Sequence, residues 1–179
     1  MNMTSQYVPQ TSFRIRKDGD WAVLEYDQLF KDKRVVVFSL PGAFTPTCSN
    51  TQLPNYDLMY PQFKALGVDA VYCVSVNDPF VMNAWFAELE IQNVKAIPDG
   101  NMDFTRGMGM LVHKADKNFG MRSWRYAMVV ENGQVLQMFV EPGKDDNVAE
   151  DPYGESSPEI VLKYCEYLNA RDALVIAGA

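Results

Sequence analysis

The stretch RVVVFSLPG, residues 34–42, decides the fold expected for this chain. Its first seven residues form a continuous run rich in β-branched and other apolar side chains, which is typical of a strand buried on both faces, and the proline–glycine pair ends it. A second run of the same kind covers residues 68–76. Between the two, residues 48–66 carry apolar side chains at helical spacing, although Pro54 and Pro61 predict a kink or an irregular turn.

A strand, a helix and a strand joined by short turns predict a βαβ unit with parallel strands. Around this unit the sequence predicts a small hairpin within 13–24, a helix from Pro79, a strand at 94–97, a short helical insertion, a hairpin at 126–140 turning at Asn132-Gly133, and a closing helix from Ser157. We therefore expect an α/β fold of the thioredoxin-like kind, with a central mixed β-sheet flanked by helices. The chain shows no boundary, so residues 1–179 are expected to form a single domain.

Composition and charge exclude several classes of function. The 179 residues are 47% hydrophobic and 22% charged, which is ordinary for a globular protein and excludes disorder as the main state. The net charge of −7, with no basic run, argues against nucleic-acid binding. No apolar run reaches the length of a membrane span, and residues 1–10 contain no apolar core of a signal peptide. We therefore expect a cytoplasmic protein with no membrane partner.

The cysteines point to free thiols in a reducing compartment. There are three, with no CxxC pair, and a single histidine, so neither a zinc site nor a complete disulfide framework is expected. Cys73 lies in the middle of an apolar strand and Cys165 on the apolar face of the last helix. Both are interpreted first as small core residues.

Cys48 differs from the other two because it ends the turn PGAFTPTC, residues 41–48, between a buried strand and a helix start. Ligands of open α/β sheets bind at the carboxyl ends of strands, and a helix N-terminus favours a thiolate. A helix end supplies about 0.5–2 kcal/mol, whereas making the thiolate of an ordinary thiol dominant takes about 3–4 kcal/mol. A nearby cation is therefore needed, and Arg122 and Arg125 are the candidates. The alternative, an inert buried thiol, fits poorly with a turn rich in Pro, Gly and Thr.

The residues around Cys48 resemble a known family. Pro41, Thr45 and Cys48 match the Pro-x-x-x-Thr-x-x-Cys motif of peroxiredoxins, and the whole turn resembles the type II (fifth-class) subfamily. The segments 75–81 and 122–126 are similar to that subfamily too, so the likeness covers nearly the whole chain. It is greatest to the peroxiredoxin half of bacterial peroxiredoxin–glutaredoxin fusions, whose glutaredoxin half has no counterpart here.

The resemblance implies a thiol-dependent peroxidase that reduces hydrogen peroxide and alkyl hydroperoxides. Cys48 would be the peroxidatic cysteine and become a sulfenic acid. Thr45 would hold the peroxide, Arg125 would favour the thiolate and steady the developing charge, and Pro41 would shield the sulfur from water. Arg122 is the rival cation, with an ion pair elsewhere as its alternative role. The substrate-contacting residues would be Gly42, Phe44 and Thr47. No metal or organic cofactor is implied.

The sulfenic acid must be reduced for the enzyme to turn over. The resemblance makes Cys73 and Cys165 possible resolving cysteines, but relatives with an internal disulfide carry theirs in a loop before the last helix, and residues 141–157 contain none. We therefore expect a one-cysteine cycle in which glutathione and a separate glutaredoxin act as reductants, with thioredoxin as the alternative.

Subfamily members usually form a homodimer near the active site. Phe44, Phe80 and Trp85 are equally consistent with such a surface and with the core. The expected biological role is antioxidant defence and redox homeostasis. The alternative function is a redox-sensing or chaperone-like module that uses Cys48 without turnover.

Overall fold

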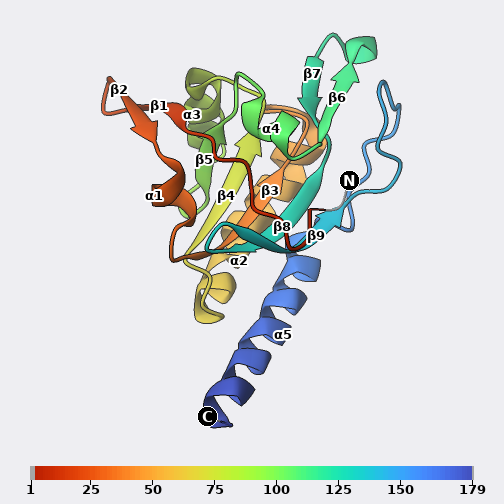
Figure 1. The fold of residues 1–179 in the computed structure, drawn as a ribbon. Helices are drawn as coiled ribbons and strands as arrows, with labels where there is room; N and C mark the ends of the chain where they lie inside the picture. The colour runs from red at the N-terminus through yellow and green to blue at the C-terminus, as the bar shows by residue number, and fades with distance from the viewer. Residues whose placement is uncertain (1–2, 179) are drawn as a thin grey trace.

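The computed structural model describes residues 3–178, and its centre is a five-stranded sheet in the order β5-β4-β3-β8-β9. These strands are β3 (Arg34–Ser39), β4 (Ala70–Ser75), β5 (Lys95–Pro98), β8 (Tyr126–Glu131) and β9 (Gln134–Val140). Strands β3, β4 and β5 are parallel, whereas β8 and β9 run antiparallel to their neighbours. The mixed, thioredoxin-like sheet and the βαβ unit are therefore confirmed (Figure 1).

Three helices contribute to the core on one face of the sheet. They are α2 (Leu53–Ala65), α3 (Pro79–Glu88) and α5 (Pro158–Ala177). The ring of Tyr56 on α2 stacks on Phe38 of β3 with the ring centroids 4.0 Å apart, and all three cysteines belong to this core. The apolar spacing after Pro79 predicts an inner face formed by Val81, Ala84, Trp85 and Leu89. This is partly wrong, because Ala84 is exposed while Met82 and Trp85 are buried.

The other face is covered by the N-terminal part of the chain together with α4. The covering elements are β1 (Phe13–Lys17), β2 (Asp20–Leu24), α1 (Tyr26–Phe30) and α4 (Asp103–Gly107). Phe13, Phe30 and Phe104 come from three of these elements and pack together as rings. The β1–β2 hairpin is as predicted, whereas α1 is too short to give a periodic signal.

A second hairpin interrupts the region where only a helical insertion was expected. It consists of β6 (Leu111–Lys114), the 3₁₀ turn η2 (Ala115–Lys117) and β7 (Gly120–Ser123). Asn118 closes the turn with a φ of 55°, a left-handed conformation that asparagine tolerates. The only histidine, His113, is exposed on β6. This hairpin contacts the loop 141–157, which in turn reaches the site.

Helix α5 begins after Ser157 and extends away from the sheet at its C-terminal end (Figure 1). Its first half buries Val161, Cys165 and Leu168, whereas Leu174 and Ile176 near its end are exposed. Within residues 3–178, no helix combines the length and the apolar character needed to cross a membrane.

Candidate active site

Cys48 opens a π-helical turn that leads into α2. This turn, η1 (Cys48–Gln52), is closed by the N–H of Leu53, which donates to the carbonyl of Cys48 five residues earlier. Pro54 has no N–H to offer the preceding turn, which explains the irregularity that the sequence predicted. π-Turns inserted in α-helices occur frequently at functional sites.

Cys48 is fully buried, and its sulfur contacts Arg125, which directly precedes β8. Nη1 of Arg125 lies 3.5 Å from Sγ of Cys48 and also donates to the side-chain oxygen of Gln52. Burial lowers the pKa of Arg125, but the charges of Cys48 and Asp151 outweigh burial, so the net effect raises it. The guanidinium therefore stays protonated against the sulfur.

Thr45 and Gly42 shape the turn before the cysteine. The hydroxyl of Thr45 donates to the carbonyl of Gly42 over 2.7 Å, which leaves the Oγ1 lone pairs free to accept a hydrogen bond. Gly42 is buried, and a Cβ at this position would collide with the guanidinium of Arg122. Asn77 fixes the same turn, because its Oδ1 accepts from the N–H of Ala43 at 3.0 Å.

Arg122 lies in the same region but does not reach the sulfur by a hydrogen bond. Its Nη1 donates to the carbonyl of Pro41 at 3.3 Å and its Nε to the carbonyl of Phe119 at 3.0 Å. Burial lowers its pKa, and the nearby Cys48 partly offsets that effect. Of the two candidate cations, the structure therefore brings Arg125 against the sulfur and places Arg122 on the backbone of the turn.

The remaining predicted contact residues occupy different positions around the turn. Phe44 has a φ of 63° and is 55% exposed. Thr47 is half-buried and directly precedes η1, but its hydroxyl makes no capping hydrogen bond. Pro41 is buried in the turn that follows β3. Phe44, Phe80 and Trp85 were each consistent with a dimer surface or with the core. In the structure Phe44 and Phe80 are exposed, whereas Trp85 lies in the core.

Three residues near the sulfur were not found by sequence reasoning. Gln52 lies four residues after Cys48, a spacing that places both on one side of a helix and was available as a signal. Ser49 accepts a hydrogen bond of 2.9 Å from the indole N–H of Trp85. Asp151 pairs with Nη2 of Arg125 at 2.6 Å. It lies in the loop 141–157, whose Pro, Gly, Asp and Glu residues predict only a solvated surface. Nothing in the sequence pattern distinguishes it from its acidic neighbours.

Cys73 and Cys165 are free thiols buried in the same core as Cys48. Cys73 pairs in register with Phe38 in the centre of the sheet. Burial raises the pKa of Cys73 well above its ordinary value and the pKa of Cys165 to about 11. Both thiols are therefore protonated and weakly nucleophilic near neutral pH.

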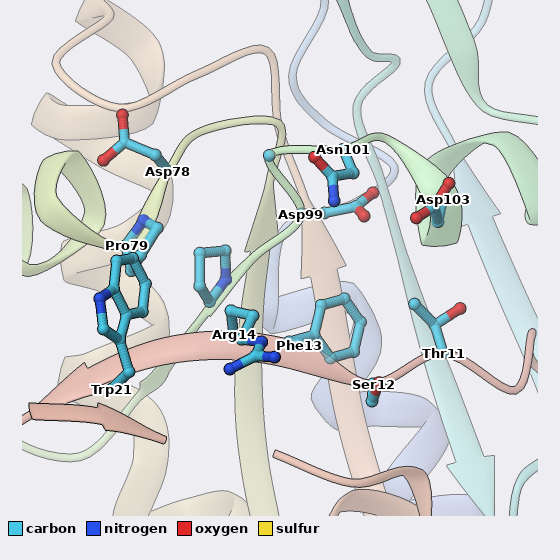
Figure 2. A pocket seen from close by; sticks show the side chains of 12 residues that line it. Thr11, Ser12, Phe13, Arg14, Trp21, Asp78, Pro79, Asp99, Asn101 and Asp103 are labelled. Atoms are coloured by element: carbon cyan, nitrogen blue, oxygen red, sulfur yellow. The ribbon is translucent and has the colours of Figure 1, made fainter. Parts of the chain in front are cut away.

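A cavity of about 510 Å³ lies elsewhere, between the β1–β2 hairpin and the loop after β5 (Figure 2). Its carboxylates are already engaged: Asp78 caps α3, and Asp99 accepts hydrogen bonds from Phe104 and Thr105 at the start of α4. Trp21 and Arg14 line its lower side in Figure 2. Because Cys48, Thr45 and Arg125 do not line it, the cavity is separate from the cysteine site.

Among residues 3–178, no three His, Cys, Asp or Glu side chains gather where they would hold a metal ion. The chemistry available at the site is that of a buried cysteine, a helix N-terminus and a charged arginine. Together with the mixed sheet, these features define a thioredoxin-like domain of the thiol-dependent oxidoreductase class.

Comparisons with known proteins specify the class further. The profile of the Redoxin family matches residues 4–153. The hybrid peroxiredoxin hyPrx5 of Haemophilus influenzae is 52% identical over 163 residues, which cover 91% of this chain and 66% of that protein. A peroxiredoxin of Rhizobium etli is 51% identical over 172 residues, covering 91% of this chain and 96% of that one. The chain belongs to the redoxin family and, within it, to the peroxiredoxins, which are thiol peroxidases.

Solved structures agree with this assignment. The Plasmodium falciparum antioxidant protein, a 1-Cys peroxiredoxin, superposes with a TM-score of 0.87 at 36% identity, over 92% of this chain and 98% of that one. Reduced Prx3 of Vibrio vulnificus in complex with H₂O₂ gives a TM-score of 0.83 at 35% identity, over 92% and 99% of the two chains. The chain spans about two thirds of the hybrid relative and nearly all of these two neighbours.

Proposed function

We propose that this peroxiredoxin reduces hydrogen peroxide and alkyl hydroperoxides with Cys48 as the peroxidatic residue. The observation that carries the proposal is the 3.5 Å contact between the buried Cys48 sulfur and the charged Arg125. The thiolate attacks the nearer oxygen of the hydroperoxide and the O–O bond breaks. Cys48 becomes a sulfenic acid, and the departing oxygen takes a proton and leaves as water or an alcohol.

The other residues of the turn hold the peroxide during this step. The free lone pairs of Thr45 Oγ1 accept from the peroxide O–H, while the Arg125 guanidinium stabilises the charge that develops on the departing oxygen. Gly42, Phe44 and Thr47 contribute the backbone that surrounds the substrate, and Pro41 covers the sulfur. Fully buried sulfur suits a small substrate, because a larger molecule reaches it only if the turn opens.

The proposed cycle uses one protein cysteine. A glutathione thiolate attacks the sulfenic sulfur to form a mixed disulfide, and the displaced hydroxide takes a proton from solvent and leaves as water. A glutaredoxin thiolate then attacks the glutathione sulfur and releases the Cys48 thiolate. The burial and raised pKa values of Cys73 and Cys165 support this cycle, since neither is ready to attack a sulfenic acid. The similarity to a hybrid peroxiredoxin and to a 1-Cys peroxiredoxin supports it as well. Thioredoxin is the competing reductant.

The proposed assembly is a homodimer. Phe44 in the cysteine turn and Phe80 at the start of α3 are 55% and 58% exposed, and Trp21 meets Phe80 edge-on. Aromatic residues of this kind are enriched at protein interfaces. We place the protein, as a single domain, in the cytoplasm, where its role would be antioxidant defence.

A coupled assay tests the function and its rival together. Reduced protein is mixed with hydrogen peroxide and NADPH, either with glutathione reductase, glutathione and glutaredoxin or with thioredoxin and its reductase. Many turnovers with the glutathione system, lost in Cys48→Ser, support the proposal. Turnover with thioredoxin alone would make thioredoxin the reductant in place of glutathione and glutaredoxin. Consumption of one equivalent without turnover in either system would instead support a redox-sensing or chaperone-like module.

A further inference from the structure

The loop 141–157, called the strap below, holds the side chain of Arg125. Oδ1 of Asp151 lies 2.6 Å from Nη2, and the carbonyl of Pro152 accepts from Nε at 3.1 Å. The Tyr153 ring lies 5.8 Å from the guanidinium carbon. Because the guanidinium is a rigid planar fork, fixing Nε and Nη2 also fixes Nη1, the nitrogen that contacts the Cys48 sulfur.

The strap is itself anchored before it reaches Arg125. The N–H of His113 on β6 donates to Asp146 at 2.7 Å, and the N–H of Asn147 donates back to the carbonyl of His113 at 2.7 Å. The ammonium of Lys117 donates to the carbonyl of Val148 at 3.0 Å. Figure 1 shows the strap running beside β6. The hairpin that the sequence did not predict therefore supports one side of the strap.

The far end of the strap is held by a buried carboxylate. Glu141 is 3% exposed, and its Oε1 accepts from the N–H of Gly154 at 2.9 Å and from the N–H and hydroxyl of Ser156 at 2.8 and 2.7 Å. The hydroxyl of Tyr56, on the helix that follows Cys48, donates to the carbonyl of Ser156 at 2.7 Å. Asp151 thus lies between two fixed ends, at a defined position relative to α2.

Asp151 also balances buried positive charge. Arg125 and Lys114 are 1% and 3% exposed, and the Lys114 ammonium lies 5.6 Å from the centroid of the Trp124 ring. Burial is the largest influence on the pKa of Lys114 and lowers it. Asp151 raises the same pKa, and Arg125 lowers it. Asp151 therefore interacts favourably with both cations, which repel each other.

We propose that Asp151 is a positioning residue for the peroxidase reaction, which orients the Arg125 guanidinium so that Nη1 meets the Cys48 sulfur and the peroxide. The inference rests on the proposed function of Cys48 and Arg125. Asp151 does not touch the sulfur or the substrate. Without it, the guanidinium keeps its charge near Cys48 but loses its ion pair at Nη2, one of the contacts that fix its rotation beside those to Pro152 and Gln52. The thiolate is then still favoured, whereas the alignment needed to break the O–O bond is lost.

Two rate constants separate these effects. Stopped-flow Trp fluorescence gives the rate of oxidation by hydrogen peroxide, with Trp85 as a reporter next to Ser49. Alkylation of Cys48 by iodoacetamide at pH 7 reports thiolate reactivity without needing Arg125 to be aligned. For Asp151→Ala we expect the peroxide rate to fall about tenfold to a hundredfold, while the alkylation rate stays close to wild type. For Asp151→Asn, which keeps an acceptor oxygen, the peroxide rate should fall less. For Asp151→Glu, most of the lost peroxide rate should be recovered.

Glu155→Gln is the matched control, because it removes one negative charge from an exposed strap residue that does not contact Arg125. Its two rates should equal those of wild type, and circular dichroism should show all variants folded. A peroxide rate for Asp151→Ala equal to that of wild type would overturn the inference while leaving the proposed function intact. Equal losses of the peroxide and alkylation rates would also overturn it. A wild-type protein that is inert toward peroxide would instead refute the proposed function.

Discussion

Nη1 of Arg125 lies 3.5 Å from the sulfur of Cys48, although 77 positions separate the two residues in the chain. Cys48 follows the end of β3, and Arg125 precedes β8, the antiparallel neighbour of β3. Adjacent strands of one sheet therefore bring a nucleophile and a cation to the same edge. In the proposed reaction, the arginine supplies the positive charge that stabilises both the thiolate and the developing oxyanion.

Replacing Arg125 with lysine tests the geometry of this cation rather than its charge. A lysine keeps the positive charge but lacks the planar fork that contacts Cys48, Gln52 and Asp151 together. We expect the rate of oxidation by hydrogen peroxide to fall about 100-fold. The matched control is Arg122→Lys. Within residues 3–178, the hydrogen bonds of Arg122 go to backbone carbonyls and not to the sulfur, so its replacement should cost much less. Equal losses in both variants would contradict the assignment of Arg125.

Thr45 offers a test that separates its hydroxyl from its methyl group. Thr45→Val removes the hydrogen bond to Gly42 and the lone pairs proposed to accept from the peroxide. We expect the second-order rate constant with hydrogen peroxide to fall at least tenfold. Thr45→Ser restores the oxygen and should recover most of the rate. If the valine variant matched wild type, Thr45 would have only a packing role.

From the burial of Cys165 we expect the protein to lose stability at alkaline pH. Its folded pKa of about 11 lies above the ordinary value of 9.0 because burial disfavours the thiolate. Between these pH values unfolding releases a proton, so the free energy of unfolding falls as the pH rises. The slope from this group is at most about 1.4 kcal/mol per pH unit. Urea unfolding from pH 8 to 11 should show a shallower decline for Cys165→Ala than for wild type. Identical slopes would mean that this thiol ionises as easily in the folded state as in the unfolded state.

The proposed dimer is tested at Phe80. Phe80→Asp places a charge in the exposed ring pair of Phe80 and Trp21, and we expect light scattering to show a monomer where wild type is a dimer. Leu58→Asp is the control, because Leu58 is 76% exposed on α2 and should leave the mass unchanged. A wild-type monomer at micromolar concentration would contradict the proposed interface.

The sequence predicted the sheet and the cysteine turn but not the support for the arginine. The runs at 34–40 and 68–76 and the Asn132-Gly133 turn are local signals, and the βαβ unit and the later hairpin followed from them. The β6–β7 hairpin turns through Ala115–Lys117 and Asn118, which carry no strong turn signature. Asp151 is one acidic residue among several in its loop. Its pairing with Arg125 depends on long-range packing, which periodicity does not encode.

The measurement that tests the central claim most directly is the intact mass of fully reduced protein after one equivalent of hydrogen peroxide, with a thiol-trapping quench within seconds. The account predicts a gain of one oxygen that maps to Cys48, with Cys73 and Cys165 still free thiols. A loss of two hydrogens would show Cys48 joined to one of the buried cysteines and would contradict the one-cysteine cycle. An unchanged mass would contradict the peroxidase role of Cys48 itself.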